Sequence, residues 1–131
     1  MSQVPLILVI DDEKDFLEIF KIKFSDAGFR VESAESGSAG IQKAKELKPD
    51  LILMDVKMPI MDGVEALLKL KEAPETKNIK VVFLTSLGGI EEEVQGLNKR
   101  YAKEIGAAGY IRKTDDLGEM TERVKSFLDQ E

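Results

Sequence analysis

The sequence predicts an α/β fold, a three-layer sandwich with a five-stranded parallel sheet between two layers of helices. Short apolar runs alternate with longer amphipathic runs along the whole chain. Strand–helix–strand alternation implies parallel pairing, because parallel strands need crossover connections, and we expect these to be right-handed with helices on both faces. Several strand candidates are apolar throughout, as expected when both faces of a sheet are covered.

The first apolar run, Leu6–Ile10, is predicted to be a strand. The next segment, Glu13–Asp26, is predicted to be a helix, because phenylalanines recur every fourth residue inside it and Gly28 follows it as a stop signal. Arg30–Ser33 is predicted to be a short strand. Ser36–Leu47 is predicted to be a helix with a face of alanine, isoleucine and leucine.

The middle of the chain repeats this pattern. Leu51–Met54 is a continuous apolar strand candidate. Pro59 and the pair Asp62–Gly63 mark a loop and a turn. The leucine-rich segment Val64–Lys71 is predicted to be a helix, and Val81–Leu84 the next strand.

The last third is predicted to contain a long helix at Ile90–Ile105, a short strand at Gly109–Ile111 and a final helix at Asp116–Leu128. The long helix has acidic residues at its start and basic residues near its end, which match the helix dipole, but Gly96 interrupts its apolar stripe. It is either an extended helix packed on the sheet or, in its extra length, a surface for a partner.

Size and composition restrict the possible functions. The 131 residues suit one domain, which we assign to residues 1–131. The chain has no cysteine and no histidine, which excludes disulfides, thiolate chemistry and histidine catalysis or ligation. The net charge of −6 argues against direct nucleic-acid binding. No apolar run is long enough for a membrane span or a secretory signal, so a cytoplasmic location is expected.

Polar residues end the predicted strands in a pattern that indicates a functional site. Asp11 and Asp12 follow the first strand, Asp55 the third, Thr85 the fourth and Lys113 the fifth. The carboxyl ends of parallel strands share one edge, where open α/β sheets bind their ligands. Three carboxylates that meet there favour a hard cation such as Mg²⁺. We expect Asp12 and Asp55 to bind it directly and Asp11 to bind directly or through water.

The same residues are consistent with phosphoryl transfer. A carboxylate such as that of Asp55 can attack phosphorus and form an aspartyl phosphate. The metal would neutralise one side of the transferring group, Lys113 the other, and the Thr85 hydroxyl would donate to a phosphoryl oxygen. Simpler alternatives remain for single residues: Asp11 or Asp12 caps the following helix, Lys113 is a surface lysine, and Thr85 only packs at a strand end.

These motifs together resemble the receiver domain of two-component response regulators, over roughly residues 4 to 128. The resemblance implies a flavodoxin-like, doubly wound sheet with five helices and strand order 2-1-3-4-5, which is the known order of the chemotaxis receiver and is carried over from it. The motifs that carry the resemblance are Val9-Ile10-Asp11-Asp12, Leu53-Met54-Asp55-Val56-Lys57-Met58-Pro59 with Met61-Asp62-Gly63, Phe83-Leu84-Thr85-Ser86 and Gly109-Tyr110-Ile111-Arg112-Lys113.

The resemblance also implies roles. Asp55 would be the phosphoacceptor, Asp11 and Asp12 would hold Mg²⁺, and the backbone carbonyl of Lys57 would complete the protein ligands. Thr85 and Tyr110 would form a switch pair that alters the surface of the helix at 90–105, the strand at 109–111 and the last helix. The alternative for Tyr110 is a half-buried ring with its hydroxyl in water. The phosphodonor would be a histidine kinase or a phosphotransfer protein, and the downstream target is a protein that the sequence does not name.

Two positions depart from the family pattern. Lys57 lies two residues past the acceptor, and we hypothesise that it sets the lifetime of the phosphorylated state. Thr114 stands where receivers usually have proline after the lysine, in a bond that is typically cis there. A cis bond without proline costs roughly 2.5–4 kcal/mol, so either the bond is strained or the loop takes another path.

The main expectation is a phosphorylation-dependent signalling module that catalyses only its own phosphorylation and dephosphorylation. The start of the chain and the absence of a trailing linker favour a stand-alone receiver. An inactive receiver used as a scaffold is one alternative. A phosphohydrolase of the haloacid-dehalogenase type is another, but it requires a second aspartate two residues after the nucleophile, where this chain has Lys57.

Overall fold

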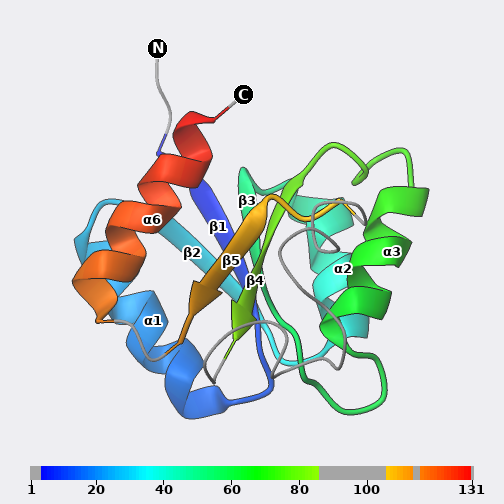
Figure 1. The fold of residues 1–131 in the computed structure, drawn as a ribbon, viewed down its shortest axis with the longest axis horizontal. Coiled ribbons are helices and arrows are strands. Elements are labelled where there is room, and N and C mark those ends of the chain that lie inside the picture. The colour runs from blue at the N-terminus through cyan, green and yellow to red at the C-terminus, as the bar shows by residue number, and fades with distance from the viewer. Residues whose placement is uncertain (1–3, 86–105, 114–115, 131) are drawn as a thin grey trace.

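A computed structural model of the chain describes residues 4–85, 106–113 and 116–130. Its sheet has five parallel strands in the order β2-β1-β3-β4-β5, as predicted. Figure 1 shows them with the helices that the structure describes. The strands are β1 (Leu6–Ile10), β2 (Arg30–Ala34), β3 (Leu51–Asp55), β4 (Lys80–Thr85) and β5 (Gly109–Arg112). The helices are α1 (Lys14–Asp26), α2 (Gly37–Leu47), α3 (Gly63–Glu72) and α6 (Leu117–Asp129).

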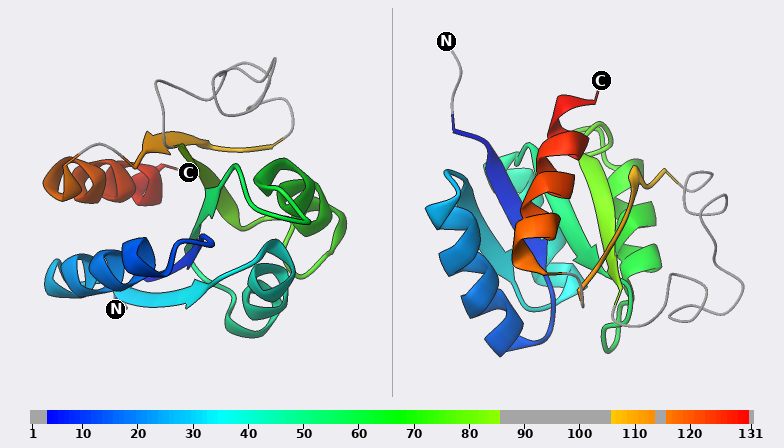
Figure 2. Two further views of the ribbon diagram at one scale, coloured as in Figure 1. Left: turned by 90° about the horizontal axis from the view of Figure 1, so that it is seen from below. Right: turned by 60° about the vertical axis from the view of Figure 1, so that its left-hand side comes forward.

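The helices cover both faces of the sheet, which confirms the three-layer sandwich. Figure 2 shows α1 and α6 side by side on one face and α2 and α3 on the other. Crossovers between parallel strands require this arrangement, because each helix carries the chain back to the edge where the next strand begins. Within the described residues, no helix combines the length and the apolar character that crossing a bilayer requires.

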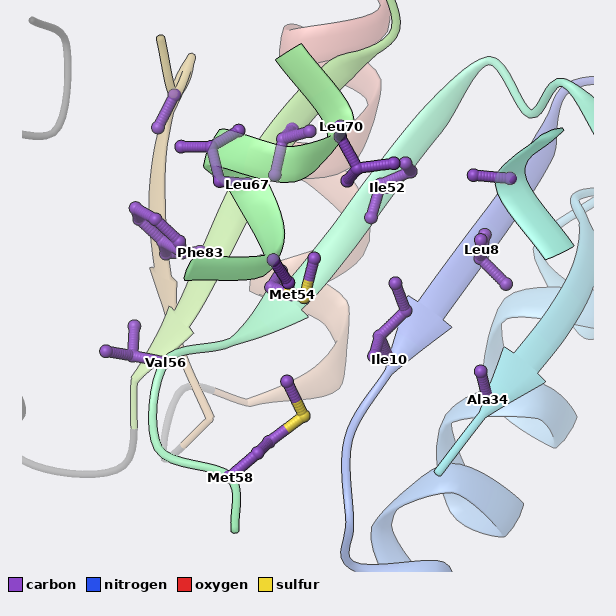
Figure 3. Close-up of a cluster of buried hydrophobic side chains, with 14 residues drawn as sticks. Leu8, Ile10, Ala34, Ile52, Met54, Val56, Met58, Leu67, Leu70 and Phe83 are labelled. Carbon is purple, nitrogen blue, oxygen red and sulfur yellow. The ribbon is translucent and has the colours of Figure 1, made fainter. Parts of the chain in front are cut away.

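Two hydrophobic cores fill the space between the layers. The first packs side chains of β1, β3 and β4 against α2 and α3 and includes Ile52, Met54 and Phe83 (Figure 3). The second packs the opposite face against α1 and α6. The phenylalanines that indicated the first helix lie there, with the rings of Phe20 and Phe24 stacked at a centroid distance of 3.9 Å. The all-apolar central strands are therefore buried on both faces.

Helices α2, α3 and α6 begin at short polar side chains that satisfy free backbone N–H groups. The Ser36 hydroxyl accepts from Ala39 N at 3.1 Å, and the Asp62 carboxylate accepts from Glu65 N at 2.9 Å. Asp116 caps α6 in the same manner through Gly118 N. These N-caps correct the predicted starts at Ser36 and Asp116, because a capping residue precedes the first helical residue.

Other element ends also differ from the prediction by one residue. The helix predicted from Glu13 begins at Lys14, and the one predicted over Val64–Lys71 spans Gly63–Glu72. The third and fourth strands extend to Asp55 and Thr85 because the backbone ladder continues past their apolar residues. The predicted helix Ile90–Ile105 and the Lys113–Thr114 bond lie outside the described residues.

Candidate functional site

The three aspartates singled out in the sequence meet at the carboxyl edge of the sheet. Ile10 pairs with Met54, so the residues that follow, Asp11 and Asp55, emerge side by side from neighbouring strands. Carboxylate oxygens of Asp11, Asp12 and Asp55 all lie within 4.8 Å of one another. Asp11 is completely buried and Asp55 only 4% exposed, while Asp12 is exposed. The sheet register thus forms an acidic pocket with one open side.

Thr85 and Lys113 are fixed beside this pocket by backbone hydrogen bonds. Val56 N donates to Leu84 O at 3.1 Å, which ties the chain after Asp55 to β4. Lys113 N donates to Thr85 O at 2.7 Å, which ties the end of β5 to the same strand. The strand-end pattern therefore predicted four neighbouring positions of the site.

The Lys113 side chain lies against Asp11. Its Nζ is 2.7 Å from Asp11 Oδ2 and also bonds to the Glu13 carboxylate. The ammonium lies 4.6 Å from the centroid of the Phe16 ring, and only 7% of the side chain is exposed. Lys113 is therefore no solvated surface lysine. Glu13 was absent from the predicted site; its position directly after two aspartates, at the start of a helix, was the available signal.

The electrostatics of the pocket follow from burial and from the crowding of like charges. Burial, then the neighbouring carboxylates of Asp11 and Asp12, raise the pKa of Asp55 to about 8, against the opposing effect of Lys113. Burial also raises the pKa of Asp11, although Lys113 opposes it. Burial would lower the pKa of Lys113, but its bonds to Asp11 and Glu13 raise it overall. Without a metal ion, the pocket therefore disfavours the full ionisation of all three carboxylates.

Two buried polar atoms lack a hydrogen-bond partner among the described residues: Asp11 Oδ2 and Thr85 Oγ1. Asp11 Oδ2 is nevertheless paired, because it lies 2.7 Å from the Lys113 ammonium, so Thr85 Oγ1 is the unsatisfied atom. Buried polar atoms are normally satisfied, so an orphan at a site calls for a ligand. A carboxylate oxygen suits a hard cation, and a hydroxyl suits a phosphoryl oxygen. The residues present therefore fit Mg²⁺ and a phosphoryl group.

The capping alternative for the aspartate pair does not hold. The N-cap of α1 is Glu13, which makes no side-chain capping bond. Asp11 accepts from Glu13 N at 2.9 Å, one position before the helix, and its second oxygen faces Lys113. Asp11 therefore orders the turn into α1 while it lines the pocket.

The loop after Asp55 is clamped at its base. Gly63 N donates to Val56 O at 2.8 Å, and a Cβ atom on Gly63 would lie 2.3 Å from the backbone oxygen of Asp55. Only glycine permits this approach. Within the loop the Lys57 side chain is exposed, and among the described residues it forms no ion pair with a carboxylate.

The tip of this loop is a γ-turn centred on Ile60. Met61 N donates to Pro59 O at 2.8 Å, and Ile60 has a φ of 71°. This positive-φ form of the turn is rare and strained, and a β-branched residue at positive φ is an outlier. Such strain costs of the order of 1–3 kcal/mol. Ile60 did not figure in the predicted site.

Tyr110 is half-buried in β5. It packs against the core on the α2–α3 side, and the Arg123 guanidinium lies 6.0 Å from the centroid of its ring. Phe83 is its partner in the β4–β5 register, two residues before Thr85. The ring therefore lies on the strand next to Thr85, a position compatible with the predicted switch pair.

The doubly wound fold and the acidic pocket at the carboxyl edge of its sheet together match one class of proteins, the receiver domains of signalling systems. The sequence profile of the response regulator receiver domain matches residues 7–125. This chain belongs to that family of two-component systems. It is 35% identical to the DNA-binding dual master transcriptional regulator RpaA of Synechocystis sp. over 125 residues, 95% of this chain and 49% of that protein. The chain spans about half the length of this relative and of the PrrA regulators.

Other similar proteins have the length of this chain. It is 30% identical to the sporulation initiation phosphotransferase F of Bacillus subtilis, over 93% of this chain and 92% of that protein. A putative response regulator from Chloroflexus aurantiacus has a similar structure, with a TM-score of 0.84, 28% identity and coverage of 98% and 100%. The chemotaxis protein CheY4 of Vibrio cholerae has a TM-score of 0.83, 25% identity and coverage of 95% and 99%.

Proposed function

We propose that this receiver accepts a phosphoryl group on Asp55 from a phosphohistidine of a histidine kinase or phosphotransfer protein, and thereby alters a surface that binds a partner. The observation that supports this is the cluster of three carboxylates within 4.8 Å, with Lys113 paired to Asp11 and with the buried Thr85 hydroxyl unsatisfied. The proposed location is the cytoplasm, the proposed domain is residues 1–131, and neither nucleic acid nor membrane is a proposed direct partner.

Mg²⁺ is the proposed cofactor. Asp11, Asp12 and Asp55 would supply carboxylate oxygens, and the Lys57 carbonyl would supply one more. When bound, the cation neutralises charge on the phosphoryl oxygens and on the acidic cluster. The chain's own contribution is to hold the carboxylates together and to keep water away from Asp11 and Asp55, which are buried.

In the transfer step, one carboxylate oxygen of Asp55 forms a bond to phosphorus while the bond from phosphorus to the imidazole nitrogen breaks. The bonding pair returns to the imidazole nitrogen, and a proton from solvent water on the ring makes the leaving group a neutral imidazole. Such a transfer depends on positioning and charge neutralisation more than on acid–base catalysis. The Lys113 ammonium lies against Asp11 at the pocket wall, where it would balance the added charge.

The buried Thr85 hydroxyl is the observation that supports a conformational switch on phosphorylation. Thr85 is completely buried and its Oγ1 has no hydrogen-bond partner in the described part of the chain. A phosphoryl oxygen on Asp55 would supply an acceptor for this hydroxyl, since Asp55 is beside Leu84 in the sheet register. We propose that Thr85 then moves toward Asp55 and that Tyr110 turns inward behind it. The responding surface would combine residues 90–105, β5 and α6.

The lifetime of the aspartyl phosphate is proposed to depend on Lys57, whose side chain is exposed beside the acceptor. Dephosphorylation of the wild type is compared with that of Lys57→Ala and Lys57→Asn. A change in the rate constant is expected. Equal rates in all three proteins would remove this role from Lys57.

The test of the proposed function is labelling by acetyl phosphate, which needs no protein partner. We expect Mg²⁺-dependent incorporation of phosphate that alkali releases, and none in Asp55→Asn or in EDTA. Asp26→Asn, at the surface end of α1, is the control and should label like the wild type. Absence of labelling and of beryllofluoride binding in the wild type would instead indicate an inactive receiver that acts as a scaffold. Turnover of p-nitrophenyl phosphate would indicate a phosphohydrolase.

A further inference from the structure

A fully exposed isoleucine lies in the loop between the acceptor strand and α3. Ile60 has a relative exposure of 104%, the highest of the large apolar residues that are exposed in the described part of the chain. Its neighbours in that loop behave differently, because Met58 is buried and Met61 packs against the α2–α3 side of the core. Ile60 thus contributes nothing to the core of the free protein.

The backbone conformation at Ile60 adds local strain to this exposure. Ile60 is the centre of the positive-φ γ-turn, a conformation that glycine and asparagine adopt far more readily than a β-branched residue. The free chain therefore carries both exposed apolar surface and local strain at one position. Neither is compensated by a contact within the described residues. A contact between Ile60 and another molecule would offset both costs.

The position of Ile60 limits which molecule that is. The loop is closed at its base by the bond from Gly63 N to Val56 O, and Gly63 packs on the backbone of Asp55. Ile60 is four positions after Val56, so their Cα atoms lie at most about 14 Å apart. Figure 1 shows this loop, which leads into α3, on the edge where β1 and β3 end. Ile60 therefore lies in a loop at the same edge of the sheet as the acidic pocket, and we call this edge the rim (Figure 1).

A phosphoryl donor has to contact this rim. Asp55 is only 4% exposed, so a donor imidazole must enter the pocket to bring its phosphorus in line with the carboxylate. The donor surface around that imidazole then lies over the loops at the carboxyl edge. An exposed apolar side chain on such a loop suits a small apolar depression beside the donor histidine, because aliphatic anchors in pockets contribute strongly to protein interfaces.

We propose that Ile60 is a docking residue for the phosphohistidine donor, and that it inserts into an apolar depression next to the donor's histidine. This inference rests on the proposed function of Asp55. Ile60 itself touches no reacting atom; it affects association with a protein donor and not the chemistry at the carboxylate. A small phosphodonor should therefore be insensitive to it.

The test compares two donors and three variants. The protein donor is the purified histidine kinase of the source genome that phosphorylates this receiver fastest after its own phosphorylation by ATP; the small donor is acetyl phosphate. Ile60→Asn removes the apolar side chain and relieves the strain. Ile60→Leu keeps an apolar side chain without the β-branch. Val4→Asn changes an exposed apolar residue that precedes β1, on the opposite edge of the sheet.

We expect Ile60→Asn to lower kcat/KM for the kinase about tenfold, chiefly through KM, and to leave the rate with acetyl phosphate unchanged. Its Tm should rise by about 2–8 °C as the strain is relieved. Ile60→Leu should keep at least half of the kcat/KM, and Val4→Asn should match the wild type. The Kd for the unphosphorylated kinase, measured by calorimetry in EDTA, should weaken in parallel for Ile60→Asn alone.

Several results would overturn the inference. An unchanged kcat/KM for Ile60→Asn removes the residue from the donor interface, and weakened binding to a downstream protein would then assign it there. An equal loss with acetyl phosphate would mean that the substitution distorts the pocket. If no kinase of the genome phosphorylates the wild type while acetyl phosphate does, the docking role fails and the proposed acceptor survives. If acetyl phosphate fails too, the proposed function fails with it.

Discussion

Lys113 and Asp11 form an ion pair with 2.7 Å between Nζ and Oδ2, and both side chains are almost completely withdrawn from solvent. The two residues lie at the ends of β5 and β1, strands that are separated in the sheet by β3 and β4. The Lys113 side chain therefore links the end of β5 to the end of β1 along the carboxyl edge of the sheet. Charge balance in the free pocket depends on this contact, and so does stability.

Loss of the Lys113 ammonium should destabilise the fold. Lys113→Met keeps the length and apolar stem of the side chain but leaves Asp11 buried without a cation, which typically costs about 3–5 kcal/mol. We expect the free energy of unfolding, measured in urea at pH 7 in EDTA, to fall by about 3 kcal/mol. The loss should be at the lower end of the range because Asp11 can take up a proton in the variant.

The matched control is Lys125→Met, which removes an exposed lysine that pairs with Glu122 within α6 at 3.6 Å. Exposed pairs of this kind contribute about 0–1 kcal/mol. The double variant Asp11→Asn with Lys113→Met should lose less than the sum of the two single variants, since it removes both charges. Equal losses in Lys113→Met and Lys125→Met would show that the buried pair has no special role.

The raised pKa of Asp55 predicts that the metal-free protein loses stability as pH rises from about 4 to about 8. In that window the folded state holds a proton on Asp55 that the unfolded chain, with a pKa of 3.8, has already released. Stability therefore falls with increasing pH, and the contribution is fully present only below the unfolded pKa. Asp55→Asn should flatten most of this slope and be the more stable protein at pH 8.

Mg²⁺ supplies the control for this prediction. A cation competes with the proton for the same oxygens, so the gain in stability from Mg²⁺ should be larger at pH 8 than at pH 6. The gain should be small at both pH values in Asp55→Asn. Thermal unfolding of both proteins in EDTA and in excess Mg²⁺, across the pH range, measures these differences. A wild type whose stability rises with pH in EDTA would contradict the assigned shift.

The close approach of Gly63 to Asp55 predicts a strong effect of a single methyl group. In Gly63→Ala the new Cβ would meet the Asp55 backbone oxygen at 2.3 Å and Val56 Cα at 2.9 Å, and backbone atoms cannot move aside cheaply. We expect a loss of about 3 kcal/mol in unfolding free energy and slower labelling by acetyl phosphate, because the acceptor is displaced.

Gly37→Ala is the control. Its Cβ would meet the flexible Met61 side chain at 3.0 Å and the Met61 backbone oxygen at 3.3 Å, and it would not meet the Asp55 backbone. We expect a change within about 0.5 kcal/mol and normal labelling. Similar losses in the two alanine variants would mean that contact with the Asp55 backbone is not what makes Gly63 necessary.

Much of this site was predictable because its residues follow apolar strands. Asp11, Asp55, Thr85 and Lys113 each end a run that periodicity identifies, and parallel strands place such ends on one edge. The ends of the strands were less predictable, since Asp55 and Thr85 continue the hydrogen-bond ladder although neither is apolar. Ladder extension depends on the neighbouring strand, which a local pattern does not contain.

Glu13 and Ile60 show what the sequence did not predict. Glu13 pairs with Lys113, one hundred residues away, and this contact depends on how two long side chains meet above a folded edge. Ile60 lies in a segment whose Pro59 and Asp62–Gly63 predict a turn, but its β-branched side chain argues against a positive φ. Rules of local propensity fail there because the clamp between Val56 and Gly63 determines the turn.

The buried hydroxyl of Thr85 predicts a separation of stability from function. Thr85→Val replaces the hydroxyl with a methyl group of similar size, at a position with no exposure and with an unpaired Oγ1. Removing an unsatisfied hydroxyl should leave the free energy of unfolding unchanged or raise it by up to about 1 kcal/mol in EDTA. The phosphorylated state, however, would lose a hydrogen bond to a charged group, so labelling by acetyl phosphate should slow by about tenfold.

Thr76→Val provides the matched control, because Thr76 is also buried but its Oγ1 donates to Leu70 O at 2.6 Å. There the same substitution breaks a hydrogen bond that exists in the free protein, which should cost about 1 kcal/mol and leave labelling unchanged. The two threonines should thus give opposite patterns in urea unfolding and in phosphate incorporation. If Thr85→Val is destabilised as much as Thr76→Val and labels normally, the Thr85 hydroxyl has a structural role and no part in binding the phosphoryl group.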